Sequence, residues 1–245
     1  MKFLLFFFLA IPLYSNAQDS SKKISDWSGF LSGAGLYQSG NTNKFYIQGA
    51  GELKRAGRIL ETILFASIGY GENKGRKDED EIIAAFTADL FYENKFSPFI
   101  LQYLNYSFAK GIDLRSQSGG GIKYVPIENE KNKTSISAAL IYDYENLTAK
   151  PGNFDQDKIR FSFRLKTKQD LLKEHLIFTM VAFFQPDISQ ISSANFWVDS
   201  NLKVPVHEKI SFTANYLYTF QDVVSVGRVR ADNKLTFGMR FDFGQ

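Results

Sequence analysis

The sequence lacks cysteine altogether, and it has only two histidines, His175 and His207, in 245 residues. Without cysteine, neither a disulfide framework nor a thiolate metal site can form, so stability must come from hydrogen bonds and burial. A serine hydrolase needs a histidine base beside its nucleophile, and we expect both histidines to lie in connections between strands. We therefore predict that the protein is not an enzyme and has no catalytic residue, metal ligand or cofactor.

Charge of one sign is not in excess either. The chain has 29 Lys and Arg against 26 Asp and Glu, and the two signs are interleaved along it. A nucleic-acid-binding surface needs a positive field. We therefore predict that nucleic acid is not a partner.

Long apolar runs are also missing beyond the N-terminus. Residues 1–17 have a lysine at position 2, an apolar run over residues 3–13, and the small residues Ser15 and Ala17 before a polar glutamine. This pattern predicts a secretory signal peptide over 1–17, followed by a periplasmic segment over 18–26 and one domain over 27–245. The later apolar stretch 176–184 is far shorter than the roughly 20 residues of a membrane helix, so a mature chain that spans a membrane must do so with strands.

Alternation of polar and apolar residues is what the chain has in abundance. In the stretch KISFTANYLYTFQD, residues 209–222, apolar side chains from Ile210 to Phe220 fall on one parity and mostly polar ones on the other. A period of two indicates a strand with one apolar face and one polar face. The same pattern predicts twelve strands, at about 27–37, 44–54, 59–71, 82–92, 98–108, 114–124, 134–145, 158–167, 174–185, 195–204, 209–221 and 233–243.

Alternation alone does not decide which face meets water. An inward apolar face would place several Phe, Tyr, Leu or Ile side chains from each of a dozen strands into one lumen, whereas the polar face mixes Gly, Ser and Thr with charges of both signs. We therefore predict an all-β, transmembrane antiparallel β-barrel of about twelve strands, with its apolar face in the lipid of the outer membrane. Aromatic residues near the predicted strand ends support interfacial girdles: Tyr37, Tyr70, Tyr92, Phe96, Phe108, Tyr124, Tyr142, Tyr144, Trp197 and Phe220.

This location implies several partners. We expect contact with outer-membrane lipid and lipopolysaccharide, insertion by the barrel-assembly machinery and, if the lumen is open, passage of small solutes. The acidic run at 78–81 lacks the ligand spacing of a calcium loop and follows Lys74, Arg76 and Lys77. We interpret it as part of a solvated extracellular loop, with contact to charged lipid headgroups as the alternative.

Charged residues on the polar face are the candidate functional residues. With Glu52 and Lys54, the predicted lumen-lining residues are Glu61, Asp89, Arg115, Lys123, Asp143, Arg160, Arg164, Asp199, Lys203 and Arg240. They can line a solute path, or they can pair into a network that fills the lumen. Twelve strands fall between the roughly 8 that give a filled interior and the 16–18 that leave a channel. We favour a narrow or occluded polar lumen, with a porin-like diffusion channel for small solutes as the alternative. A loop centred near residue 151 predicts that Asp143 lies opposite Arg160.

Two glycine-rich segments carry a family resemblance. The stretch WSGFLSGAGLYQSGNTN, residues 27–43, and the stretch LRSQSGGGIKY, residues 114–124, resemble segments of the salt-induced outer-membrane proteins. The resemblance implies an outer-membrane β-barrel with no established activity or site residues. We predict a structural or stress-associated role in the cell envelope. Because no helix follows Gly119–Gly121, we interpret this triplet as making room in the strand or bending it, not as a phosphate cradle.

Overall fold

The computed structural model describes residues 26–38, 43–148, 154–172, 175–224, 227 and 229–244. The predicted signal peptide over 1–17 and nearly all of the predicted segment over 18–26 lie outside these residues. The described strands are β1 (Asp26–Gln38), β2 (Lys44–Ala56), β3 (Leu60–Asn73), β4 (Arg76–Leu90), β5 (Phe96–Ser107), β6 (Ile112–Glu128), β7 (Asn132–Leu147), β8 (Phe154–Asp170), β9 (Ile177–Pro186), β10 (Ala194–His207), β11 (Ile210–Phe220) and β12 (Ala231–Phe243).

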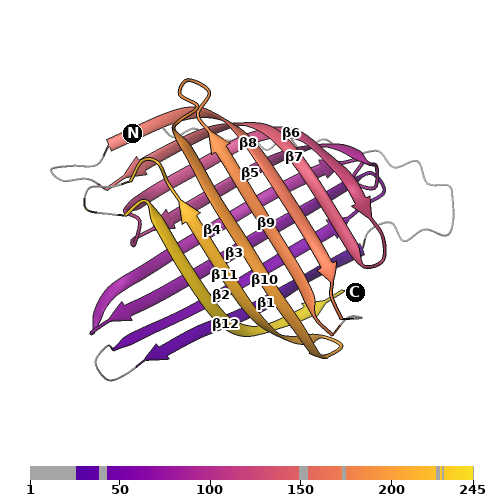
Figure 1. The fold of residues 1–245 in the computed structure, drawn as a ribbon, viewed down its shortest axis with the longest axis horizontal. Helices are drawn as coiled ribbons and strands as arrows, with labels where there is room; N and C mark the ends of the chain where they lie inside the picture. Colours follow the sequence, from indigo (N-terminus) through magenta and orange to yellow (C-terminus); the bar gives the residue numbers. More distant parts are fainter. Residues whose placement is uncertain are drawn as a thin grey trace, which may run out of the picture.

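These strands form one closed antiparallel barrel in which each strand pairs with its neighbours in the sequence (Figure 1). The first and last strands close the barrel, with pairing from Gly29↔Phe243 to Gly35↔Phe237. Closure matters because an open sheet edge would leave a row of backbone N–H and C=O groups unpaired. None of the described residues belongs to a helix that is long and apolar enough to cross a membrane.

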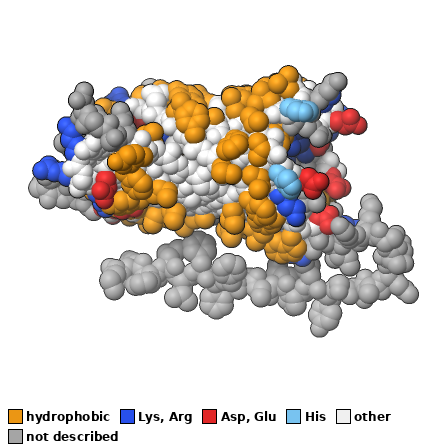
Figure 2. Space-filling model, turned by 90° about the horizontal axis from the view of Figure 1, so that it is seen from below, with side chains coloured by type: hydrophobic (Ala, Val, Ile, Leu, Met, Phe, Trp, Pro, Cys, Tyr) orange, Lys and Arg blue, Asp and Glu red, His pale blue; other side chains and the backbone are white. Residues whose placement is uncertain are grey.

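The two faces of the barrel wall follow from the alternation in the sequence. On β12, Leu235 and Phe237 are 56% and 60% exposed, whereas the intervening Thr236 is only 6% exposed. Most of the buried residues are polar, and the exposed ones include many large apolar side chains. Figure 2 shows apolar side chains over the wall between charged side chains at the two ends. This distribution is the reverse of that in a water-soluble protein, whose large apolar residues are mostly inside.

The predicted barrel of about twelve strands is confirmed, and each predicted strand overlaps an observed one. The prediction of a solvated loop around the acidic run is wrong. Strand β4 begins at Arg76, so residues 78–81 lie on the strand and are half-buried. A bulge between Gly71 and Glu72 of β3 accommodates this extension.

The predicted register of the β7–β8 hairpin is also wrong, by two residues. Asp143 lies opposite Lys158, and Arg160 lies opposite Ile141. Because side chains in a strand alternate with period two, a shift of two residues leaves Asp143 and Arg160 on the same face.

Candidate functional site: the interior of the barrel

Aromatic side chains reach across part of the interior. The ring of Tyr103 on β5 lies 6.4 Å from that of Trp197 on β10, and Trp197 lies 4.2 Å from Phe183 on β9. Four strands separate β5 from β10 along the wall, so this contact has to pass through the interior. The prediction that Trp197 belongs to an outer girdle is therefore wrong. Its parity on β10 is that of Asp199, which we predicted to face the lumen.

Arg164 of β8 extends this cluster. Its guanidinium carbon lies 5.5 Å from the ring centroid of Phe99 on β5 and 5.9 Å from that of Phe183. The Nε atom donates a hydrogen bond to Oγ of Ser137 at 3.0 Å. The interior on the side of β5 to β10 thus contains a cluster of aromatic rings, with a cation held between two of them.

A buried ion pair lies on the same side. Arg160 and Asp143 are each 1% exposed, and Arg160 donates from Nε to Oδ2 of Asp143 at 2.8 Å. The Nη1 atom of Arg160 also donates to the backbone oxygens of Gln185 at 3.2 Å and Ser193 at 3.3 Å. Arg160 therefore holds the connection between β9 and β10 against β8.

That connection has its own anchor. The Ser189 amide and hydroxyl both donate to Oδ1 of Asp187, at 2.8 and 2.7 Å, and Lys158 Nζ lies 3.7 Å from the Asp187 carboxylate. Desolvation alone would raise the pKa of Asp187, but these hydrogen bonds and the nearby cations outweigh it and lower the pKa.

Most of the other predicted lumen residues are brought together in pairs. Arg115 pairs with Glu145 and Lys123 pairs with Asp89. Further pairs join Glu61 to Lys54 at 2.5 Å, and both Lys203 and Arg240 to Asp242, at 3.1 and 2.7 Å. Arg240 also lies over the ring of Phe30, at 3.7 Å. Asp199 accepts a hydrogen bond from Asn215 at 2.5 Å. Among the described residues, neither Arg164 nor Asp199 has an ion-pair partner.

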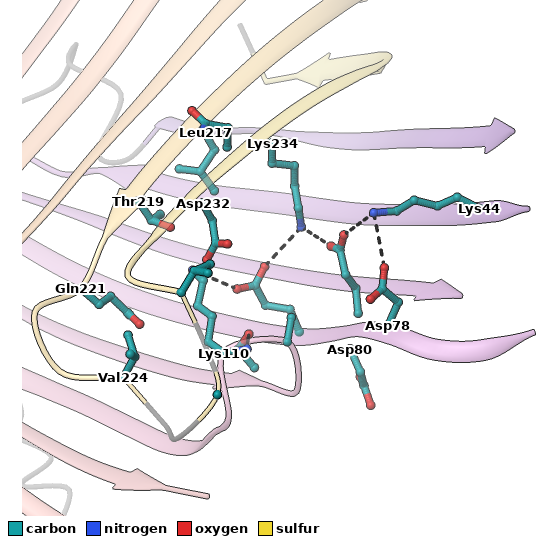
Figure 3. A pocket seen from close by; sticks show the side chains of 17 residues that line it. Lys44, Asp78, Asp80, Lys110, Leu217, Thr219, Gln221, Val224, Asp232 and Lys234 are labelled. Carbon is teal, nitrogen blue, oxygen red and sulfur yellow. Dashed lines mark hydrogen bonds and ion pairs between the residues drawn. The ribbon is translucent and has the colours of Figure 1, made fainter. Parts of the chain in front are cut away.

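A charged cavity of about 400 Å³ opens at the end of the barrel where the turns after β3, β5 and β11 lie. Figure 3 shows Lys234 pointing toward the carboxylates of β4. Its Nζ lies 2.6 Å from Glu79, 3.9 Å from Glu81 and 3.2 Å from the hydroxyl of Tyr46. Because β12 and β4 are not neighbours, this cluster also crosses the interior.

Lysines from two other elements complete the cluster. Lys44 of β2 lies 3.4 Å from Asp78 and 3.5 Å from Glu79 (Figure 3). Lys110, in the turn after β5, lies 4.0 Å from Glu81. Burial lowers the pKa of Lys110, although Glu81 acts in the opposite direction. Sequence reasoning missed this cluster. The only signal was the polar-face position of Lys234, because its partners lie far away in the sequence.

A second cavity, of about 680 Å³, opens at the other end of the barrel and is lined by Lys203, Asp242 and both histidines. Ser211 also lines it, but the described residues show no hydrogen bond between Ser211 and His207. Across the described part of the chain, no group of three or more His, Asp and Glu side chains is placed to hold a metal ion.

A closed antiparallel barrel with an apolar outer face and a charged interior has the architecture of the outer-membrane β-barrels. The structure is similar to that of the NanC porin, with a TM-score of 0.55 and 10% sequence identity over 87% of this chain and 100% of that one. An outer membrane channel from Pseudomonas putida F1 matches with a TM-score of 0.48 and 8% identity, over 91% and 97% of the two chains. The translocator domain of the autotransporter NalP from Neisseria meningitidis matches with a TM-score of 0.44 and 11% identity, over 92% and 90%.

The chain belongs to the family described as "protein of unknown function, DUF481", whose profile matches residues 33–243. Among curated proteins, none matches this chain. At 10% identity, the likeness to NanC concerns the fold alone. The resemblance to the salt-induced outer-membrane proteins stays a prediction.

Proposed function

We propose that this protein is a non-enzymatic outer-membrane β-barrel whose narrow or occluded polar lumen gives it a structural or stress-associated role in the cell envelope. The observation that carries the proposal is the set of contacts between strands that are not neighbours. Tyr103 meets Trp197 from β5 to β10, and Lys234 meets Glu79 from β12 to β4. Such contacts fill part of the cross-section of the lumen at more than one level along the barrel axis, and they narrow the space through which a solute could pass.

The outer face supports the location in a membrane. Its large apolar side chains are exposed from one strand to the next, as Leu31, Ile68 and Phe237 illustrate at 61%, 64% and 60%. The strands are 10 to 17 residues long, enough for the roughly 9–11 tilted residues that cross a bilayer. We propose lipid and lipopolysaccharide as the partners of this face, and the barrel-assembly machinery as the means of its insertion.

A second candidate is a diffusion channel for small solutes, and a specific observation favours it. Lys166 of β8 and Asp199 of β10 have interior parity but are exposed, which indicates that water reaches part of the interior. The wall opposite the aromatic cluster carries small inward side chains, such as the paired Ser32 and Ala50, between its charged ones. A narrow path along that wall would join the two end cavities.

Conductance in planar bilayers separates the two functions. We expect the purified, heat-modifiable barrel to give small or rare openings compared with a general porin reconstituted in parallel. Long-lived, large openings would favour the channel and overturn the occluded lumen. The stress-associated role is tested separately, by comparing the amount of this protein in cells grown at low and high salt, and an unchanged amount would contradict it.

A further inference from the structure

Two neighbouring cations in the interior lack the partners that the other interior cations have. Arg164 and Lys166 are two residues apart on β8, so their side chains leave the same face of the strand. Lys54, Lys123 and Arg160 each pair with a carboxylate. Within the part of the chain that the structure describes, neither Arg164 nor Lys166 takes part in an ion pair.

Their hydrogen-bonding capacity is also largely unused. Arg164 donates through Nε to Ser137, which leaves the two terminal nitrogens of the guanidinium free within the described structure. Lys166 is exposed, and it makes no hydrogen bond to any described residue. A guanidinium and an ammonium have only donors. A group that satisfies both has to be an acceptor, and two like charges so close together favour an anionic one.

The described carboxylates that attract these cations electrostatically form no ion pair with them. Asp89 pairs with Lys123 and Glu61 pairs with Lys54. Glu52, on the far wall at β2, attracts Lys166 electrostatically but does not form an ion pair with it. The space between β8 and β2 therefore has a positive side at Arg164 and Lys166.

Aromatic rings hold the guanidinium in place. Phe99 and Phe183 flank Arg164 at 5.5 and 5.9 Å, and Phe183 in turn packs on Trp197. A guanidinium that is already oriented loses less entropy when its planar fork binds a carboxylate or a phosphate.

We propose that Arg164 and Lys166 form an anion-binding site in the lumen, which takes the carboxylate or phosphate group of a small solute. The inference rests on the proposed function only in requiring a barrel whose lumen is reached by water from at least one mouth. Passage through the whole barrel is not needed. Failure of the anion site and failure of the proposed function can therefore be told apart.

Trp197 provides a direct probe of this site. The chain has two tryptophans, and the other, Trp27, is 53% exposed and lies on β1. In Trp27→Phe protein in detergent micelles, the fluorescence of Trp197 is measured with iodide, an anionic quencher, and with caesium, a cationic one. We expect iodide to quench about threefold more strongly than caesium, because a local positive potential concentrates anions.

The matched variants remove two positive charges each. Arg164→Gln/Lys166→Gln should abolish the preference for iodide, whereas Arg58→Gln/Lys95→Gln, in exposed turns, should keep it. Equal quenching by iodide and caesium in the parent, or an unchanged preference after loss of Arg164 and Lys166, would overturn the proposal. If the double variant does not fold, Lys166→Gln alone is used, and it should at least halve the preference.

Competition identifies the chemistry of the anion. Benzoate and inorganic phosphate are each titrated against iodide, and protection of Trp197 by one of them assigns the site to carboxylates or to phosphates. Protection by neither would overturn the solute site, even where iodide is preferred. Bilayer conductance of the same preparations tests the proposed function independently, because an occluded barrel can still bind an anion from one mouth.

Discussion

Arg160 donates a hydrogen bond to Asp143 across two adjacent strands although the two residues are not directly opposite each other. The pair is diagonal, and the long guanidinium side chain spans the offset. Both side chains are 1% exposed, so water does not replace either partner when the other is lost.

Removal of this arginine should therefore be costly. We expect Arg160→Met to lower the free energy of unfolding by about 3–5 kcal/mol, because the Asp143 carboxylate is left buried without its cation. Urea titration of the barrel in lipid vesicles measures the change. The double variant Arg160→Met/Asp143→Leu should recover most of the loss.

The control for this prediction is a pair at the surface. Lys133 and Glu128 lie 2.5 Å apart with side chains 53% and 52% exposed. Lys133→Met should cost at most about 1 kcal/mol. A cost for Arg160→Met no larger than this would contradict the importance of the buried pair.

The assignment of the two faces can be tested on β11. Ala214 faces outward and Asn215 faces inward, where it donates to Asp199. Ala214→Arg should destabilise the barrel in vesicles by about 2–4 kcal/mol if it lies near the bilayer midplane. Asn215→Arg should cost much less, since an arginine there lies beside the Asp199 carboxylate. Equal costs would count against a membrane barrel with these faces.

Much of the wall could be predicted from the sequence because it depends on local alternation. A period of two specifies both the strands and their faces. The observed register of the β7–β8 hairpin differs from the predicted one by two residues, and because this is an even number, Asp143 and Arg160 still lie on the predicted face. What lies inside depends on contacts between distant segments. The pairing of Lys234 with Glu79 joins residues 155 positions apart (234 − 79), and no local pattern indicates it.

The two clearest errors have different origins. The acidic run at 78–81 looks like a loop because consecutive charges are rarely stable in a strand, but Lys44 and Lys234 from other strands neutralise it. The position of Trp197 near a strand end predicts that it belongs to the aromatic girdle at the membrane interface. Its parity on β10 placed it inside, and this signal was available in the sequence.

Glycines offer a test of close packing between strands. A Cβ atom at Gly121 would lie 2.0 Å from the backbone oxygen of Ala138, whereas one at Gly33 would meet nothing within 4 Å. We therefore expect Gly121→Ala to destabilise the barrel by about 1–3 kcal/mol and Gly33→Ala to cause no loss. Thermal unfolding followed on heat-modifiability gels measures both. Equal midpoints for the two variants would contradict a packing role for Gly121.

Trp197 should limit the passage of ions through the lumen. Its ring packs against Phe183 and reaches Tyr103 on the far side of the aromatic cluster. Trp197→Ala removes the ring and leaves room for several water molecules, each of which occupies roughly 30 Å³ in the liquid. We expect the single-channel conductance in planar bilayers to rise at least about twofold in consequence. The control is Phe212→Ala, which removes a ring that is 53% exposed on the outer face and should leave the conductance unchanged. If both variants conduct like the parent while remaining heat-modifiable, the aromatic cluster does not form the constriction, and the narrowest point has to be sought at the Lys234 cluster instead.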